Sequence, residues 1–120
     1  MTEQSKKELK TQYKNMDIPI GVYAIKNTTN NKIFVGSTAN LNAIWNRHVF
    51  QLQAGVHPNK ALQEDWSIFG ESAFRFDILS TIKKDATTIK DYSDELKELE
   101  EMFIDDLQPF NNNGYNIRKP

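Results

Sequence analysis

The sequence predicts an α+β domain in which a small, three-stranded antiparallel sheet is flanked by helices. Two segments rich in β-branched and aromatic residues, 21–26 and 32–36, are separated by turn-forming residues, as in a β-hairpin. Helical periodicity follows, and a third segment, which alternates with a period of two, lies between helical stretches. The predicted order of elements is therefore β-β-α-α-β-α.

The predicted hairpin is followed by a helix with a continuous apolar face. Asn40 is the best-placed N-cap, and Gly55 stands where a C-terminal glycine ends a helix. At 100° per residue, a helix that begins at position 41 places six residues on one face: Leu41, Ile44, Trp45, His48, Val49 and Leu52.

Three further elements complete the prediction. A second helix is expected from Asn59 to Phe69, with Ala61, Leu62, Trp66 and Phe69 inward. Residues 74–79 are expected to form the third strand, and residues 82–88 a polar connection. The last helix is expected from Asp91 or Ser93 to Leu107, because Pro109 follows. Residues 111–114 are expected to form a turn and 115–117 an extended segment.

The 120 residues suffice for one domain, which we expect over residues 19–120 after a polar N-terminal arm, residues 1–18. The absence of cysteine excludes disulfides, thiolate zinc sites and cysteine nucleophiles. No apolar run is long enough to span a membrane, and the N-terminus lacks the apolar stretch of a secretory signal. We therefore expect a cytoplasmic protein.

The formal net charge of −1 conceals two opposed halves. Residues 1–60 carry a net charge of +5, and residues 61–120 carry −6. A basic half is suited to phosphates while an acidic helix faces water. The alternative is that the acidic residues only make the helices soluble.

Glu100 is the most informative residue of the last helix. With Leu96 at 0°, Glu100 falls at about 40°, within the stripe of Leu99, Phe103 and Leu107. The neighbouring acidic residues Glu98 and Glu101 fall on the water-facing side. A carboxylate on an inner face is unfavourable unless it is paired or binds a metal. The alternatives are a buried salt bridge and a side chain that reaches solvent at the edge of the stripe.

His48 is the one titratable group on its apolar helix face. Alone, it is typical of a hydrogen-bonded core histidine. Together with Glu100 and the strand residue Tyr23, it is a candidate for an acid–base and metal cluster.

Several short motifs, in order, carry a family resemblance. They are Gly21-Val22-Tyr23, Phe34-Val35-Gly36, Ser37-Thr38-x-Asn40-Leu41, His48, His57-x-Asn59-Lys60-x-Leu62-Gln63, Trp66-x-x-Phe69-Gly70-Glu71, Phe74-x-Phe76-x-Ile78-Leu79, Leu99-Glu100 and Gly114-Tyr115-Asn116-Ile117. Together they cover residues 20–117. The sequence resembles the GIY-YIG nucleases, whose members cut nucleic acid with one divalent metal ion.

The resemblance implies a role for each matching residue. Tyr23 matches the tyrosine that activates water, and Glu100 the glutamate that holds Mg²⁺ or Mn²⁺. His48 matches the histidine that positions Tyr23 or the scissile phosphate. Asn116 matches a late polar residue that shapes the site.

Two matching positions are degenerate. Phe34 stands where the second motif has tyrosine, and Ile44 stands where the family has arginine. Arginine suits a phosphoryl transition state because its planar fork donates two charge-assisted hydrogen bonds. Arg47, about 60° further round the helix, is a candidate replacement; the alternative is an ordinary solvated arginine.

Three functions remain open at this point. The first is nucleic-acid binding, with DNA favoured, through Lys26, Lys32, Arg47 and Lys60, with hydrolysis weakened or lost. The second is an active Mg²⁺- or Mn²⁺-dependent endonuclease in which Arg47 replaces the missing arginine. The third is a non-catalytic protein-interaction module. Because the chain has no room for a separate recognition domain, we expect specificity to be low or to be supplied by a protein partner.

Overall fold

The computed structural model describes residues 18–84 and 90–117, and it confirms the α+β class and the order of elements. The strands are β1 (Ile20–Asn27), β2 (Ile33–Thr38) and β3 (Phe74–Ile82). The helices are α2 (Ile44–Ala54), α3 (Lys60–Phe69) and α4 (Ser93–Leu107), with short 3₁₀ turns η1 (Glu71–Ala73) and η2 (Asn111–Asn113). The predicted arm, residues 1–18, lies outside the described residues apart from Ile18.

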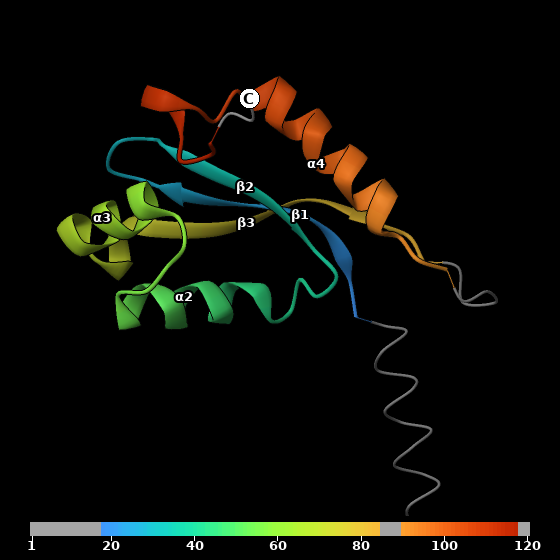
Figure 1. Ribbon diagram of the computed structural model, residues 1–120, viewed down its shortest axis with the longest axis horizontal. Helices are drawn as coiled ribbons and strands as arrows, with labels where there is room; N and C mark the ends of the chain where they lie inside the picture. The colour runs from blue at the N-terminus through green and yellow to red at the C-terminus, as the bar shows by residue number, and fades with distance from the viewer. Residues whose placement is uncertain (1–17, 85–89, 118–120) are drawn as a thin grey trace, which may run out of the picture.

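The sheet separates two helical layers. Its three strands are antiparallel in the order β2-β1-β3, so β1 is central and is paired on both sides. Figure 1 shows α2 and α3 on one face and α4 on the other. The core on the α2/α3 face is formed by Tyr23, Ile25, Leu41, Leu52, Leu62, Trp66, Phe74 and Tyr115.

The apolar face predicted for the first helix is confirmed, but its start is not. Leu41, His48 and Leu52 are buried, whereas α2 begins only at Ile44. Asn40 caps the preceding turn, where its Oδ1 accepts hydrogen bonds from the backbone N–H groups of residues 42 and 43. The cap is therefore correctly placed, but it stabilises a turn that precedes the regular helix.

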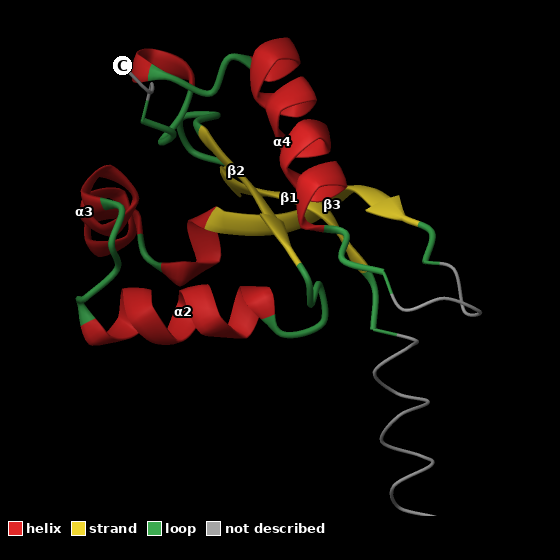
Figure 2. Cartoon of the chain, turned by 45° about the vertical axis from the view of Figure 1, so that its right-hand side comes forward, coloured by secondary structure: helices red, strands yellow, loops and turns green. Residues whose placement is uncertain are grey.

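The second helix matches its predicted bounds, with Asn59 as N-cap and Gly70 as C-cap. Leu62 and Trp66 are buried as predicted, but Ala61 and Phe69 are exposed, so their inward assignment is wrong. α3 contacts the core through a narrower stripe than the apolar pattern suggests, because it covers only one end of the sheet (Figure 2).

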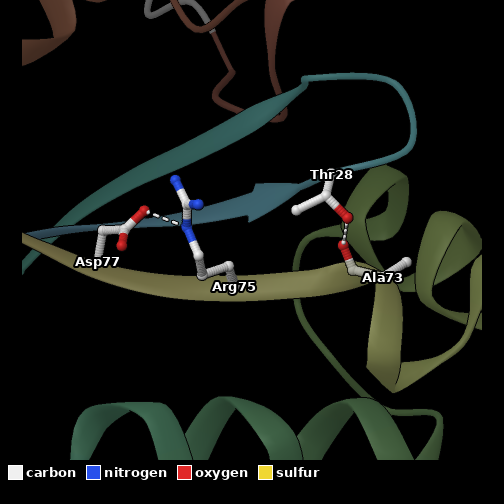
Figure 3. A network of polar contacts seen from close by, with 4 residues as sticks. All are labelled: Thr28, Ala73, Arg75 and Asp77. Atoms are coloured by element: carbon white, nitrogen blue, oxygen red, sulfur yellow. Dashed lines mark hydrogen bonds and ion pairs between the residues drawn. The ribbon is translucent and has the colours of Figure 1, made fainter.

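β3 is three residues longer than predicted and ends at Ile82, where a polar connection was expected. The residue before β3, Ala73 of η1, is held by the hairpin turn, since the backbone N–H and the hydroxyl of Thr28 both donate to its carbonyl at 2.8 Å (Figure 3). Further along the strand, Arg75 pairs with Asp77 at 2.9 Å. Residues 85–88 of the predicted connection lie outside the described residues.

The last helix and the turn after it agree with the prediction, but the bridge to the sheet lies at Gly114, and residues 115–117 form no strand. α4 begins at Ser93 and ends at Leu107, and the chain then turns through η2. The backbone N–H of Tyr115 donates to the carbonyl of Ile33 at 2.8 Å, and Gly114 forms a parallel bridge to the same residue. No helix in the described part of the chain is long and apolar enough to cross a membrane.

Candidate active site

Tyr23 lies on the central strand, and its ring crosses the neighbouring strand at a glycine. Tyr23 pairs in register with Gly36 of β2. A Cβ atom at position 36 would lie 2.6 Å from the Tyr23 hydroxyl oxygen and 2.7 Å from its Cζ. Glycine leaves this space without displacing the Tyr23 ring, and the tyrosine hydroxyl extends over β2, the strand at one edge of the sheet.

His48 of α2 holds that hydroxyl. The Tyr23 hydroxyl oxygen and His48 Nε2 are 2.7 Å apart, and both residues are buried. Burial, the neighbouring His57 and the charge of Arg47 together lower the pKa of His48 to about 4. His48 is therefore a neutral imidazole near pH 7.

His57 is a member of this cluster that the sequence analysis left without a role. Its Nε2 lies 2.8 Å from His48 Nδ1, with the two rings stacked, and burial lowers its pKa as well. The one feature of the sequence that could have indicated a role for His57 was its place in the His57-x-Asn59 motif. Nine residues and the end of a helix separate the two histidines, so sequence spacing did not indicate their contact.

Two charges of opposite sign act on the Tyr23 hydroxyl. Burial raises the pKa of Tyr23, the carboxylate of Glu100 raises it further, and the guanidinium of Arg47 lowers it. Glu100 is half-buried on α4, whereas Glu98 and Glu101 are exposed, as the helical phase predicted. The structure thus brings Tyr23 and His48 into direct contact. Glu100, on the helix across the sheet, and the exposed Arg47 influence the pair through their charges.

The donors present fit a hard metal ion held by few protein atoms. Within residues 18–84 and 90–117, no group of three or more histidine, aspartate or glutamate side chains is arranged to hold a metal. A single inward carboxylate, completed by water and phosphate oxygens, is a common way to bind Mg²⁺. Glu100 is therefore a suitable protein ligand for such an ion.

Asn116 is fully engaged with the backbone of β2. Its Oδ1 accepts from the N–H of Val35 at 2.8 Å, and its Nδ2 donates to the carbonyl of the same residue at 2.9 Å. The amide thus continues the sheet beyond the β2 edge, one residue before Gly36. It positions the strand beneath the Tyr23 hydroxyl, and both ends of its amide are occupied.

The two degenerate positions are filled by apolar packing. The ring of Phe34 lies 6.4 Å from that of Tyr23 and 5.7 Å, edge to face, from that of His48. Ile44 is partly buried against the core. Neither side chain can donate a hydrogen bond to phosphate.

The predicted basic residues are divided between the two faces of the sheet. Lys26 alternates with Tyr23 and Ile25 along β1 and so points to the α4 side, while Lys60 and Arg47 belong to helices of the other layer. Lys32 lies beside the C-terminal segment, with its Nζ 5.9 Å from the centre of the Tyr115 ring. Of these four, Arg47 is the one whose charge acts on the Tyr23–His48 pair.

Comparison with known proteins agrees with this arrangement. Residues 19–116 match the GIY-YIG catalytic domain. Over 97 residues the chain is 36% identical to the Intron-associated endonuclease 1 of Enterobacteria phage T4, a stretch that covers 81% of this chain and 36% of that protein. The match thus spans about a third of that relative's length.

Two solved structures have a similar fold. The catalytic domain of the homing endonuclease I-TevI superposes with a TM-score of 0.69 and 35% identity, covering 83% of this chain and 99% of that chain. A point mutant of the catalytic domain of the intron endonuclease I-TevI gives a TM-score of 0.71 and 34% identity, over 84% of this chain and 95% of that chain.

Proposed function

This chain belongs to the GIY-YIG catalytic-domain family, whose superfamily cleaves nucleic acids. On that premise we propose that it hydrolyses phosphodiester bonds in DNA with a divalent metal ion, at a reduced rate. One observation carries the proposal. The Tyr23 hydroxyl is held by the neutral imidazole of His48, and the charges of Glu100 and Arg47 both act on it. This is an arrangement that can deprotonate a water molecule beside a phosphate.

Glu100 is the proposed ligand for Mg²⁺ or Mn²⁺. When bound, such an ion supplies positive charge that polarises the phosphate and offsets the carboxylate of Glu100. The same carboxylate raises the pKa of Tyr23. A tyrosine serves as a base only when its anion is stabilised, so offsetting this charge favours its function.

The protein groups at the site have distinct tasks. Tyr23 accepts the proton of the attacking water, and His48 orients the phenol oxygen through the 2.7 Å hydrogen bond. Asn116 fixes β2 by two hydrogen bonds to Val35, so the strand beneath the hydroxyl keeps its place. A preorganised site of this kind needs little rearrangement during the reaction.

The reduced rate follows from Phe34 and Ile44. Loss of one preorganised donor at a charged transition state typically lowers the rate about 10²- to 10³-fold. Arg47 offsets part of this loss, because its charge already lowers the pKa of both Tyr23 and His48. Its exposed side chain is free of the apolar packing that holds Ile44.

DNA is the proposed substrate, with Lys26, Lys32 and Lys60 as further phosphate contacts and the cytoplasm as the site of action. Contacts to phosphate give affinity without sequence preference. The domain of residues 19–120 therefore needs a protein partner, or a further segment, to select its target.

A cleavage assay with a matched pair of variants tests the proposal. Supercoiled plasmid is incubated with the protein and Mg²⁺ or Mn²⁺, beside Glu100→Ala and the exposed neighbour Glu101→Ala. We expect slow cleavage by the wild type, a fall of at least about a hundredfold in Glu100→Ala, and no change in Glu101→Ala. Cleavage that survives Glu100→Ala, or DNA binding at low salt without cleavage by the wild type, would contradict the proposal.

The role of Arg47 is tested in the same assay. Arg47→Ala is expected to slow cleavage about tenfold or more, while Phe34→Tyr combined with Ile44→Arg is expected to raise the rate. If Arg47→Ala cleaves as fast as the wild type, Arg47 is an ordinary solvated arginine.

A further inference from the structure

A chain of three hydrogen bonds runs from the backbone of Asn59 to the Tyr23 hydroxyl. The Asn59 backbone N–H donates to His57 Nδ1 at 3.0 Å. His57 Nε2 lies 2.8 Å from His48 Nδ1, and His48 Nε2 lies 2.7 Å from the Tyr23 oxygen. All four residues are at least nine-tenths buried, with exposed fractions of 9%, 7%, 8% and 4% for Asn59, His57, His48 and Tyr23.

The first of these bonds has a fixed direction. A backbone N–H can only donate, so His57 Nδ1 must be the unprotonated nitrogen. A neutral imidazole carries one proton, and that of His57 is therefore on Nε2. This nitrogen faces His48 Nδ1, which must then accept, and the proton of His48 lies on its own Nε2.

The geometry points to His57 as a positioning residue: we propose that the Asn59 amide, acting through His57, holds His48 as the Nε2–H tautomer, so that His48 donates to the Tyr23 oxygen and cannot accept its proton. The hydrogen of the Tyr23 hydroxyl must then point away from His48. The catalytic meaning of this assignment rests on the proposed function, whereas the tautomer itself is a property of the folded chain.

The start of α3 keeps the donor in place. Asn59 is the N-cap of that helix, where its Oδ1 accepts from the N–H of Leu62 at 3.0 Å. Its Nδ2 donates to the carbonyl of Tyr115 at 2.7 Å. Because both ends of the side chain are held, the backbone N–H of Asn59 has little freedom to turn away from His57.

The assignment decides where the proton of Tyr23 goes. When the O–H bond of Tyr23 breaks, the proton passes to a water molecule on the solvent side, and the electron pair stays on the phenol oxygen. His48 keeps its own proton and continues to donate to that oxygen. A donated hydrogen bond stabilises the anion relative to the phenol, so His48 favours the basic form of Tyr23 without acting as a base.

Nitrogen-15 NMR of histidine-labelled protein tests the proposal directly. The chain contains only two histidines, His48 and His57, so four ring nitrogens give a readily assigned spectrum. At pH 7 we expect both rings as the neutral Nε2–H tautomer. A protonated Nδ1 on either ring would overturn the assignment, whether or not the protein cleaves DNA.

Two variants separate positioning from packing. In His57→Gln, the amide can accept from Asn59 and donate to His48, so His48 should keep its Nε2–H signal. In His57→Phe, which retains an aromatic ring but no donor, His48 should show a mixture of both tautomers and cleavage should fall about 10- to 100-fold, as for other outer-sphere partners. An unmixed Nε2–H signal in His57→Phe would overturn the role of His57. If the tautomers behave as expected but no protein cleaves DNA, the proposed function fails and the tautomer assignment stands.

Discussion

Tyr23 and Tyr115 are both buried tyrosines with hydrogen-bonded hydroxyls, yet their partners differ in kind. Their exposed fractions are 4% and 2%. Tyr115 donates to the carboxylate of Asp65 at 2.6 Å and accepts from Asn27 Nδ2 at 3.2 Å. Burial, followed by the hydrogen bond to Asp65, raises the pKa of Tyr115 to about 12. Tyr23 instead faces an imidazole nitrogen.

Burial and the carboxylate of Glu100 raise the pKa of Tyr23 further than that of Tyr115, so the imidazole partner does not by itself make Tyr23 the more acidic phenol. What differs between the two sites is the group that touches the phenol oxygen. A carboxylate accepts the phenol proton and penalises its loss, because two negative charges would then lie side by side. The hydrogen bonds of the Tyr115 hydroxyl to Asp65 and Asn27 therefore connect the hairpin, α3 and the C-terminal segment structurally. At Tyr23, the imidazole of His48 provides a hydrogen-bond donor. The phenol oxygen of Tyr23 can therefore accept a proton during the reaction.

The largest expected contrast is in cleavage rate. On the proposed function, Tyr23→Phe should lower plasmid cleavage about 10²- to 10⁴-fold, because the general base is lost. Tyr115→Phe should leave cleavage per folded molecule within a few-fold, but it should lower the free energy of unfolding by about 1–3 kcal/mol, because the buried Asn27 amide loses its acceptor. Cleavage rates and urea denaturation of both variants provide the measurement. Equal losses of cleavage in the two variants would contradict the assignment of Tyr23 as the base and of Tyr115 as a structural residue.

A second contrast concerns the glycines beside the two tyrosines. A Cβ at Gly114 would lie 2.4 Å from the backbone carbonyl oxygens of Ile33 and Pro109, which cannot move aside. Gly114→Ala should therefore lower the free energy of unfolding by about 3 kcal/mol. At Gly36 the obstacle is the end of the Tyr23 side chain, which can rotate away.

Gly36→Ala should accordingly lower the free energy of unfolding by only about 1 kcal/mol. It should lower the cleavage rate more than Gly114→Ala does, because it displaces Tyr23. Urea denaturation and the plasmid assay on the two variants check this reversal. A larger loss of stability in Gly36→Ala than in Gly114→Ala would show that Tyr23 is as rigidly held as the backbone.

A third expected effect concerns the pH dependence of stability and involves no change in cleavage. The pKa of His48 is lowered to about 4 in the folded protein from its ordinary value of 6.5. Between these values the unfolded chain binds a proton that the native protein does not, so stability is complete above pH 6.5 and falls as the pH drops towards 4. The loss between pH 7 and 4.5 should be about 2 kcal/mol.

Urea denaturation of the wild type and of His48→Gln across this range measures the effect. Glutamine can still donate to Tyr23 but does not titrate, so the variant should lose less stability on acidification. The burial of His48, the proximity of His57 and the charge of Arg47 all act in this direction. Identical pH profiles would show that the pKa of His48 is the same in the native and the unfolded protein.

Elements with strong local patterns were predictable. The existence of β1 and β3, the bounds of α3 and α4, and the half-buried phase of Glu100 follow from local residue patterns. The period-two burial predicted for residues 74–79 did not follow, since Ile78 is 52% exposed. The start of α2 and the exposure of Phe69 did not follow, because turn geometry and the extent of the sheet that a helix covers are set by packing. The polar arm and the domain boundary stay predictions.

The site divides in the same way. Local sequence identified Tyr23, His48 and Glu100 as candidates, and the apolar replacements Phe34 and Ile44 are visible in the sequence itself. The tertiary structure decides three contacts: His57 with His48, the Tyr23 ring over Gly36, and the hydrogen bonds of the Asn116 amide to the backbone of Val35. These contacts join residues on different elements, and their distances depend on how the elements pack. The sequence by itself thus determined which groups are available, and the tertiary structure alone decided which of them donate, accept or merely hold the strand in place.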